Sequence, residues 1–207
     1  MYNSDEMKRL LTILILIFTL QTPSQSDDIR DFQIEGISIG DSALDYFDKQ
    51  EINKNIDTGS LVIYPSSDKY YGMTFDHKDF FLLYESVKIH LKKNDKKFTI
   101  VGVNGMILYP DPNNFDDCLK AKKKISKQIK KDFNFTKSDN YTDNFGGKGG
   151  ESIAYVSDFD FSSGGSIRIW CSKWDQENEN TKRWTNTLNI GVSSKVFLDF
   201  LANDAFK

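Results

Sequence analysis

Residues 153–174 read IAYVSDFDFSSGGSIRIWCSKW, with alternating apolar and polar side chains on both sides of a Gly pair. Alternation with a period of two is typical of a half-buried strand, and a short Gly-containing connection between two such runs predicts a β-hairpin. A three-residue loop at 163–165 gathers the apolar side chains on one face and places Asp160 opposite Arg168 on the other, whereas a one-residue slip would mix the two faces. We therefore expect an antiparallel hairpin with one buried face and one charged face.

The charged face of this hairpin carries the candidate binding residues of the chain. They are Trp170, Trp174, Arg168, Asp158 and Asp160. Aromatic rings beside charges supply contact area at a low cost in conformational entropy, and they stack on sugars or anchor a protein partner. The alternative is that another layer of structure covers the rings. We predict that an unidentified protein or small molecule binds here.

Two cysteines, Cys118 and Cys171, are predicted to form a disulfide. The hairpin register turns Cys171 toward the apolar face. Apolar residues spaced three or four apart predict a helix over 116–133, with Cys118 on its buried side. An even number of cysteines in an exported chain is read as paired. Two separate buried thiols are the alternative.

The flanking sequence extends this architecture in both directions. Because strand-forming runs are grouped in hairpins rather than alternating with helices, the pattern predicts an α+β fold with a mainly antiparallel sheet and helices packed on one face. We expect strands at 61–64, 70–75, 80–91, 98–109, 153–161, 167–174 and 187–192, and helices at 38–47, 48–55, 116–133 and after Ser194, with Val196, Phe197 and Phe200 inward.

The sequence also predicts the turn between two central strands and a loop later in the chain. An Asn94-Asp95 turn predicts that Ile89 pairs with Ile100 and that His90 points away from the core, beside Thr99. Residues 136–151 are rich in Gly, Asn, Asp and Ser, which is typical of a mobile loop.

The N-terminal residues have the layout of a secretory signal peptide over 1–26. Lys8 and Arg9 precede an apolar run, Leu10–Leu20, that is shorter than the roughly 20 residues a bilayer-spanning helix needs. Small residues at 24 and 26 favour a cut before Asp27. We expect export to the periplasm or the medium and no transmembrane segment after signal removal. An uncleaved anchor is the alternative, and translation begins at Met1 or Met7.

The composition indicates one globular domain over 27–207. The chain has 207 residues, is 39% hydrophobic and 28% charged, and carries a formal net charge of −3. That balance gives no overall attraction to nucleic acid. A helix followed by a strand meander occurs near 27–112 and again near 113–207, which suggests an internal duplication. We expect a monomer.

Two serine motifs suggest a hydrolase as a competing function. Gly36–Gly40 matches the G-x-S-x-G nucleophile elbow around Ser38, and Gly40-Asp41-Ser42 resembles the first block of GDSL hydrolases. A serine nucleophile needs a general base, and nothing in the sequence places His77 or His90 beside either serine. We therefore favour Ser38 as a helix cap and predict no enzymatic activity.

Three further patterns suggest ligands, and each has a simpler interpretation. The Gly-rich stretch 146–152 lacks the order of a phosphate-binding loop. Residues 175–179 place acidic oxygens alternately but lack the Gly and Glu of a calcium-binding EF-hand. Seven Lys at 120, 122, 123, 124, 127, 130 and 131 would suit a polyanion, although such runs usually face water. We predict no metal, cofactor or nucleic acid.

Two longer stretches carry a family resemblance. DFQIEGISIGDSALDYFDKQEI at 31–52 and KNDKKFTIVGVNGMILY at 93–109, with one Cys in each later segment, resemble an uncharacterised family of small exported bacterial proteins. The resemblance covers most of the chain after residue 26 and implies export and a single domain, but no activity. The chain is also similar to small outer-membrane assembly accessory proteins, which place a Gly-led helix before a strand meander. They are usually lipidated at an N-terminal Cys, which is absent here.

The leading prediction is therefore an exported binding or interaction module with an unknown ligand. A serine hydrolase using Ser38 or Ser42 and an envelope assembly accessory protein are the alternatives.

Overall fold

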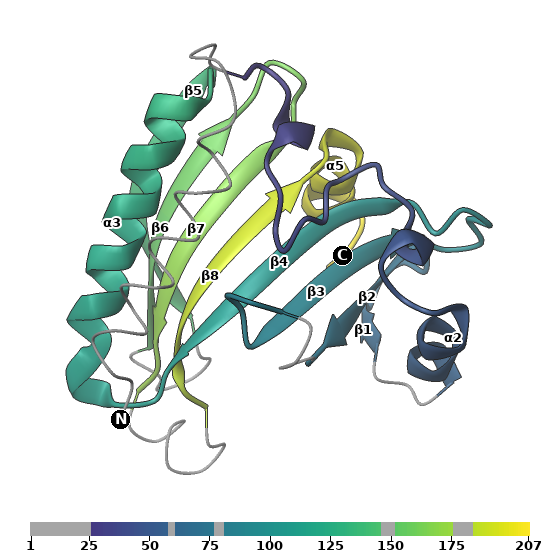
Figure 1. Ribbon diagram of the computed structural model, residues 1–207, viewed down its shortest axis with the longest axis horizontal. Helices are drawn as coiled ribbons and strands as arrows, with labels where there is room; N and C mark the ends of the chain where they lie inside the picture. The colour runs from purple at the N-terminus through teal and green to yellow at the C-terminus, as the bar shows by residue number, and fades with distance from the viewer. Residues whose placement is uncertain (1–25, 58–60, 77–80, 146–151, 176–183) are drawn as a thin grey trace.

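The computed structural model describes residues 26–57, 61–76, 81–145, 152–175 and 184–207. Within them lies an eight-stranded antiparallel sheet of order β1-β2-β3-β4-β8-β7-β6-β5 (Figure 1). The expected signal peptide lies outside the described residues except for Ser26. The strands are β1 (Leu61–Ile63), β2 (Tyr70–Phe75), β3 (Ser86–Lys92), β4 (Ile100–Tyr109), β5 (Lys137–Phe145), β6 (Ser152–Asp160), β7 (Ser166–Lys173) and β8 (Asn186–Ser193); the helices are α2 (Lys49–Asp57), α3 (Phe115–Asp132) and α5 (Lys195–Asn203).

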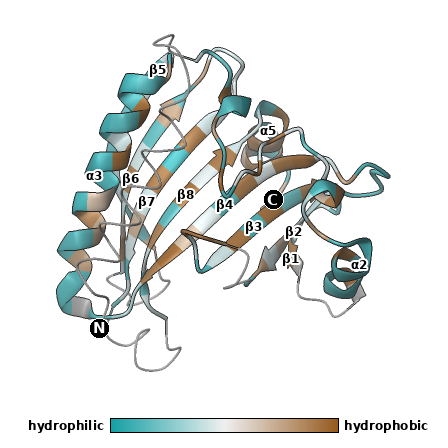
Figure 2. Ribbon diagram, viewed as in Figure 1, coloured by the Kyte–Doolittle hydropathy of each residue, from teal (hydrophilic) through white to brown (hydrophobic). Residues whose placement is uncertain are grey.

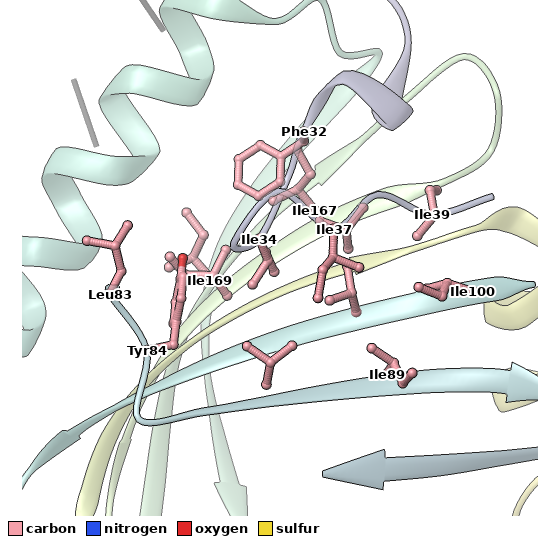
Figure 3. Packing of buried hydrophobic residues seen from close by; sticks show 14 of the residues in the cluster. Phe32, Ile34, Ile37, Ile39, Leu83, Tyr84, Ile89, Ile100, Ile167 and Ile169 are labelled. Atoms are coloured by element: carbon pink, nitrogen blue, oxygen red, sulfur yellow. The ribbon is translucent and has the colours of Figure 1, made fainter. Parts of the chain in front are cut away.

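The first face of the sheet, which carries Ile89, Val103 and Ile169, forms the main core. Helix α3 covers β7 and β8, while residues 26–47 cross the middle of the sheet (Figures 1 and 3). The crossing segment packs isoleucines onto this face of the sheet (Figure 3). The isoleucines that meet there are almost fully buried: Ile34, Ile37, Ile89, Ile167 and Ile169. In Figure 2 the hydrophobic residues, coloured brown, form bands along the central strands of the sheet.

The second face, which carries His90, Asn104 and Trp170, is covered differently. Of the helices in the described residues, α5 packs on this face, at the end formed by β2–β4. Phe197 of α5 stacks on His90 with ring centroids 4.7 Å apart, and a side chain at Gly102 would stand 3.0 Å from the Phe197 ring. Because Gly102 has no side chain, α5 can pack closely against β4 at this point.

The α+β class with an antiparallel sheet is confirmed. In each half of the chain a helix precedes a four-strand meander, and the last strands of the two halves, β4 and β8, pair at the centre. That order is the one expected from a duplication near 27–112 and 113–207, which stays a prediction.

The hairpin of β6 and β7 pairs two residues away from the expected register. Asp158, rather than Asp160, lies opposite Arg168. The loop again has three residues but lies at 162–164 rather than 163–165, because Phe161 N–H donates to the Gly165 carbonyl at 2.9 Å and closes the hairpin there. The Phe161 ring is buried in the core. A shift by two preserves the faces, so the apolar and charged sides are as predicted.

The register expected for β3 and β4 is also wrong. A bulge between His90 and Leu91 pairs Leu91 with Ile100, and Ile89 with Val103. His90 does leave the core face. It faces Gly102 and packs under α5 rather than beside Thr99, because the turn already pairs Leu91 with Ile100 instead of Phe98 and the bulge adds one further residue.

The loop expected over 136–151 is wrong where the structure describes it. Residues Lys137–Phe145 form β5, which pairs with β6 along its whole length, while 146–151 lie outside the described residues. As an edge strand with both faces largely exposed, β5 needs no apolar alternation, so its composition is that of a loop.

The helix expected at 38–47 is reduced to a 3-10 turn, Ala43–Asp45. Ser42, not Ser38, caps it by accepting a hydrogen bond from Leu44 N–H at 3.2 Å. The last helix differs in one detail, because Val196 is 58% exposed whereas Phe197 and Phe200 are buried.

Candidate binding surface

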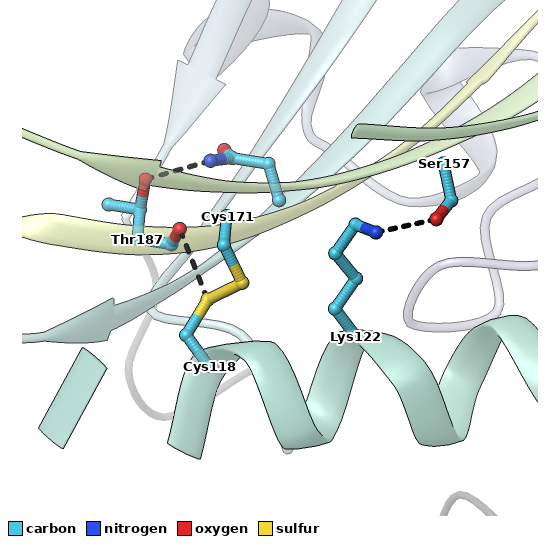
Figure 4. Close-up of a disulfide and its surroundings, with 6 residues drawn as sticks. Cys118, Lys122, Ser157, Cys171 and Thr187 are labelled. Carbon is cyan, nitrogen blue, oxygen red and sulfur yellow. Dashed lines mark hydrogen bonds between the residues drawn. A yellow bond between two sulfur atoms is a disulfide. The ribbon is translucent and has the colours of Figure 1, made fainter. Parts of the chain in front are cut away.

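The predicted disulfide ties helix α3 to β7, the strand that carries the candidate binding residues Arg168 and Trp170. Cys118 on α3 and Cys171 on β7 are bonded, with their Cα atoms 6.1 Å apart, and both residues are fully buried (Figure 4). The bridge fixes β7 from the first face. Side chains of β7 with the opposite parity, Arg168 and Trp170, therefore stand on the second face.

An ion pair with fixed geometry stands at one side of the surface. Arg168 Nε and Nη2 donate to the two carboxylate oxygens of Asp158 at 2.8 and 2.9 Å, and Tyr141 Oη donates to the same carboxylate at 2.9 Å. The hydrogen bond to Asp158 raises the pKa of Arg168. The Arg168 side chain is 55% exposed, so it is held in place by the ion pair while part of it faces solvent.

Trp170 occupies the centre of this surface. Its backbone lies between Val156 of β6 and Asn189 of β8. A side chain at Gly191 would approach the Trp170 ring at 3.4 Å. The indole therefore lies over β8 in the space that Gly191 leaves, and its partial exposure makes it available for contact.

A row of amides continues from the ring toward β4. Asn104 Nδ2 donates to Asn189 Oδ1 at 3.4 Å, and Asn189 Nδ2 donates to Thr187 Oγ1 at 2.8 Å. Asn104 Oδ1 is buried without a hydrogen-bond partner. A buried acceptor without a donor is costly, and this atom is not accessible to a ligand in the present arrangement.

The remaining predicted residues stand further from Trp170. Trp174 packs against Phe145 and Trp184, with ring centroids 4.7 and 4.3 Å away. Asp160 lies at the end of β6, where its carbonyl accepts hydrogen bonds from Thr136. The structure thus brings Trp170, Arg168 and Asp158 together, and places Trp174 and Asp160 near the two ends of the strands.

Sequence reasoning missed Tyr141, Asn104 and Asn189. Tyr141 lies in a stretch expected to be a loop, and the two asparagines lie on β4 and β8, whose pairing with each other the sequence did not predict. The sequence did contain a signal for the asparagines. Neighbouring residues of a strand point to opposite faces, so Asn104 and Asn189 lie on the face opposite the core residues Val103 and Ile190.

The serines of the hydrolase motifs have structural partners. Ser42 Oγ donates to the Lys97 carbonyl at 2.7 Å, and Ser38 N–H donates to Asp41 at 3.0 Å. Both serines belong to the segment 26–47, which crosses the first face of the sheet. His77 lies outside the described residues.

His90 belongs to a separate buried cluster on the second face. Tyr64 Oη lies 2.8 Å from His90 Nδ1, under the rings of α5. Burial, with a smaller contribution from the charge of Lys88, lowers the pKa of His90 to about 3. The imidazole is therefore neutral and packed, an arrangement that stabilises α5.

A lysine and a serine also meet beneath α3. Lys122 Nζ donates to Ser157 Oγ at 2.6 Å (Figure 4). Ser157 Oγ in turn donates to Asn140 Oδ1 at 2.6 Å. Burial lowers the pKa of Lys122, as in serine–lysine catalytic pairs. Ser157 is only 1% exposed, so a substrate cannot reach it and the pair serves packing.

Two features are absent from the described residues. These residues contain no group of three or more His, Cys, Asp or Glu side chains arranged to hold a metal ion. None of their helices combines the length and apolar character that a bilayer crossing requires.

Comparison with known proteins finds no matching family model, no matching curated protein and no matching solved structure.

Proposed function

We propose that this chain is an exported binding module whose ligand lies across Trp170 on the second face of the sheet. The observation that carries the proposal is the partly exposed indole, seated over Gly191 between the Asp158–Arg168 pair and the amides of Asn104 and Asn189. A rigid ring beside preoriented polar groups fits a ligand with a flat apolar surface edged by hydrogen-bonding groups.

Two properties of the frame support this assignment. The disulfide and the first-face core hold β7 and β8 rigidly, so the ligand would meet a preorganised surface. A disulfide also persists in an oxidising compartment, which supports export.

Replacing Trp170 with Ala tests the proposal. Wild-type protein and Trp170→Ala are each used to capture ligands from an envelope extract, and Ile63→Ala, which removes an exposed apolar side chain from β1 at the far edge, is the control. We expect Trp170→Ala to lose the captured species and Ile63→Ala to keep them, with similar melting temperatures for all three proteins.

Two results would contradict the proposal. One is undiminished capture by Trp170→Ala. The other is a loss of about 3–5 kcal/mol in unfolding free energy, the cost of truncating a covered ring, while Asp160→Ala stays as stable as the wild type.

A further inference from the structure

The outer face of α3 carries a concentration of positive charge that the proposed function does not use. Six lysines of this helix are exposed: Lys120, Lys123, Lys124, Lys127, Lys130 and Lys131. Three of them form the lysine stripe, because Lys123 and Lys124 lie four and three residues before Lys127 on one side of the helix. Between residues 118 and 131 there is no Asp or Glu. The stripe is therefore cationic on a chain whose net charge is −3.

This arrangement opposes helix stability. Like charges three or four residues apart repel each other, and Lys127 has lysines at 123, 124, 130 and 131 within that spacing. The helix is held by Cys118, by the buried Ile129 and by the sheet beneath it. Lys120 is paired with Asp117 at 2.8 Å, and Lys130 Nζ lies 5.9 Å from the centroid of the Phe159 ring. The repulsion of Lys127 by Lys123 and Lys124 would be offset by a partner outside the molecule, and that partner must be anionic.

The side-chain types narrow the partner further. Lysine is a compact point charge that does not give the bidentate geometry with which arginine selects one carboxylate or phosphate. The stripe carries no aromatic ring on which a nucleic-acid base could stack. A straight row of flexible cations on an outward-facing helix (Figure 1) suits a flat surface of dispersed negative charge.

We propose that α3 docks this protein on an anionic phospholipid surface, through electrostatic contact of its lysine stripe with the lipid headgroups. The apolar side of the helix stays against the sheet, so the contact is peripheral and sensitive to salt.

Vesicle partitioning of the whole chain tests the proposal. Binding to phosphatidylcholine vesicles with and without phosphatidylglycerol is measured, so that any contribution of the apolar run at 10–20 cancels. The test variant replaces Lys123, Lys124 and Lys127 with Gln. The matched control replaces Lys92, Lys96 and Lys97, which are exposed in the β3–β4 turn at the opposite end of the molecule (Figure 1). Both variants change the net charge equally.

We expect the wild type to prefer anionic vesicles and to lose that preference at high salt. The stripe variant should bind them roughly a hundred-fold more weakly, because each lysine near an anionic surface contributes about fivefold, and the turn variant should change little. Replacing the same three stripe lysines with Arg should preserve binding, which separates charge from folding.

Three outcomes would overturn the proposal. They are the absence of a preference for anionic vesicles, equal losses in the stripe and turn variants, and loss of binding in the Arg variant. Binding to heparin without binding to vesicles would assign the stripe to a linear polyanion instead.

Discussion

His90 shows how one side chain links pH to the packing of a helix. Its ring is stacked between the sheet and Phe197, and its Nδ1 lies 2.8 Å from the Tyr64 hydroxyl. Burial disfavours the charged imidazolium, as does the positive charge of Lys88. The neutral ring, hydrogen-bonded to Tyr64, is therefore the form that α5 packs against.

We expect protonation of His90 to weaken the fold at mildly acidic pH. Its pKa falls from the ordinary 6.5 to about 3 on folding, so between these values the unfolded chain binds a proton that the folded chain excludes. The stability that the neutral ring contributes is thus fully present above pH 6.5 and decreases as the pH falls toward 3. Urea unfolding at about pH 7 and about pH 5 should show a loss of about 1–2 kcal/mol that depends on this residue.

His90→Gln supplies the control, because glutamine keeps an acceptor near Tyr64 but does not titrate in this range. If both proteins lose the same stability between the two pH values, the effect belongs to carboxylates elsewhere and the assignment to His90 is wrong.

At the level of elements, the disulfide joins the helix and the strand on which both surfaces depend. Cys118 and Cys171 are 53 residues apart, and closing a loop of that length stabilises the fold by about 4 kcal/mol in the chain-entropy model. Replacing both with Ala should lower the unfolding free energy by about that amount. Urea unfolding of the double variant measures the loss, and a loss below about 1 kcal/mol would show that α3 is held by packing alone.

Elements with one buried face were predictable from the sequence. The helix over 116–133 and the strands flanking the Gly pair each expose one periodic apolar face to the core, so the sides of Cys118 and Cys171 followed from periodicity. Strand β5 has no such face, and its pairing with β6 uses the backbone, which any sequence supplies. Composition therefore could not reveal it.

For the hairpin of β6 and β7, the sequence predicted which side chains share a face but not which residues pair. The charged face with Arg168 and Trp170 was identified correctly, because a shift by two keeps every side chain on its face. The exact partner of Arg168 depended on how the loop after Asp160 closes, and the environment of His90 depended on a bulge and on α5. These are long-range packing events without a local sequence signal.

Across the whole molecule, the two proposed surfaces lie on opposite sides of the sheet. Helix α3 packs on the first face and turns its lysines outward, whereas Trp170 stands on the second face. A chain docked on lipid through α3 would direct Trp170 away from the bilayer. Membrane contact and ligand binding are therefore compatible in one molecule.

The start of the described chain bears on the last prediction, that the protein is exported and cut near Ser26. Ser26 N–H donates to the Asp132 carbonyl at 2.9 Å, and Asn134 N–H donates to the Ser26 carbonyl at 2.9 Å. The chain is thus attached to the end of α3 at the point where the signal-peptide pattern ends. A cut before Asp27 removes both hydrogen bonds, at a cost of about 1 kcal/mol each, which the core and the disulfide can tolerate.

N-terminal sequencing of the protein recovered from the envelope or the medium checks this expectation, and the first residue should lie close to Asp27. A recombinant chain beginning at Asp27 should then unfold about 1–2 kcal/mol more easily than one that keeps Ser26 behind a short extension. Recovery of the protein in the membrane with Met1 or Met7 still at its N-terminus would instead mean that residues 1–26 remain attached as an anchor. Docking through α3 would then begin from a chain already tethered to the bilayer.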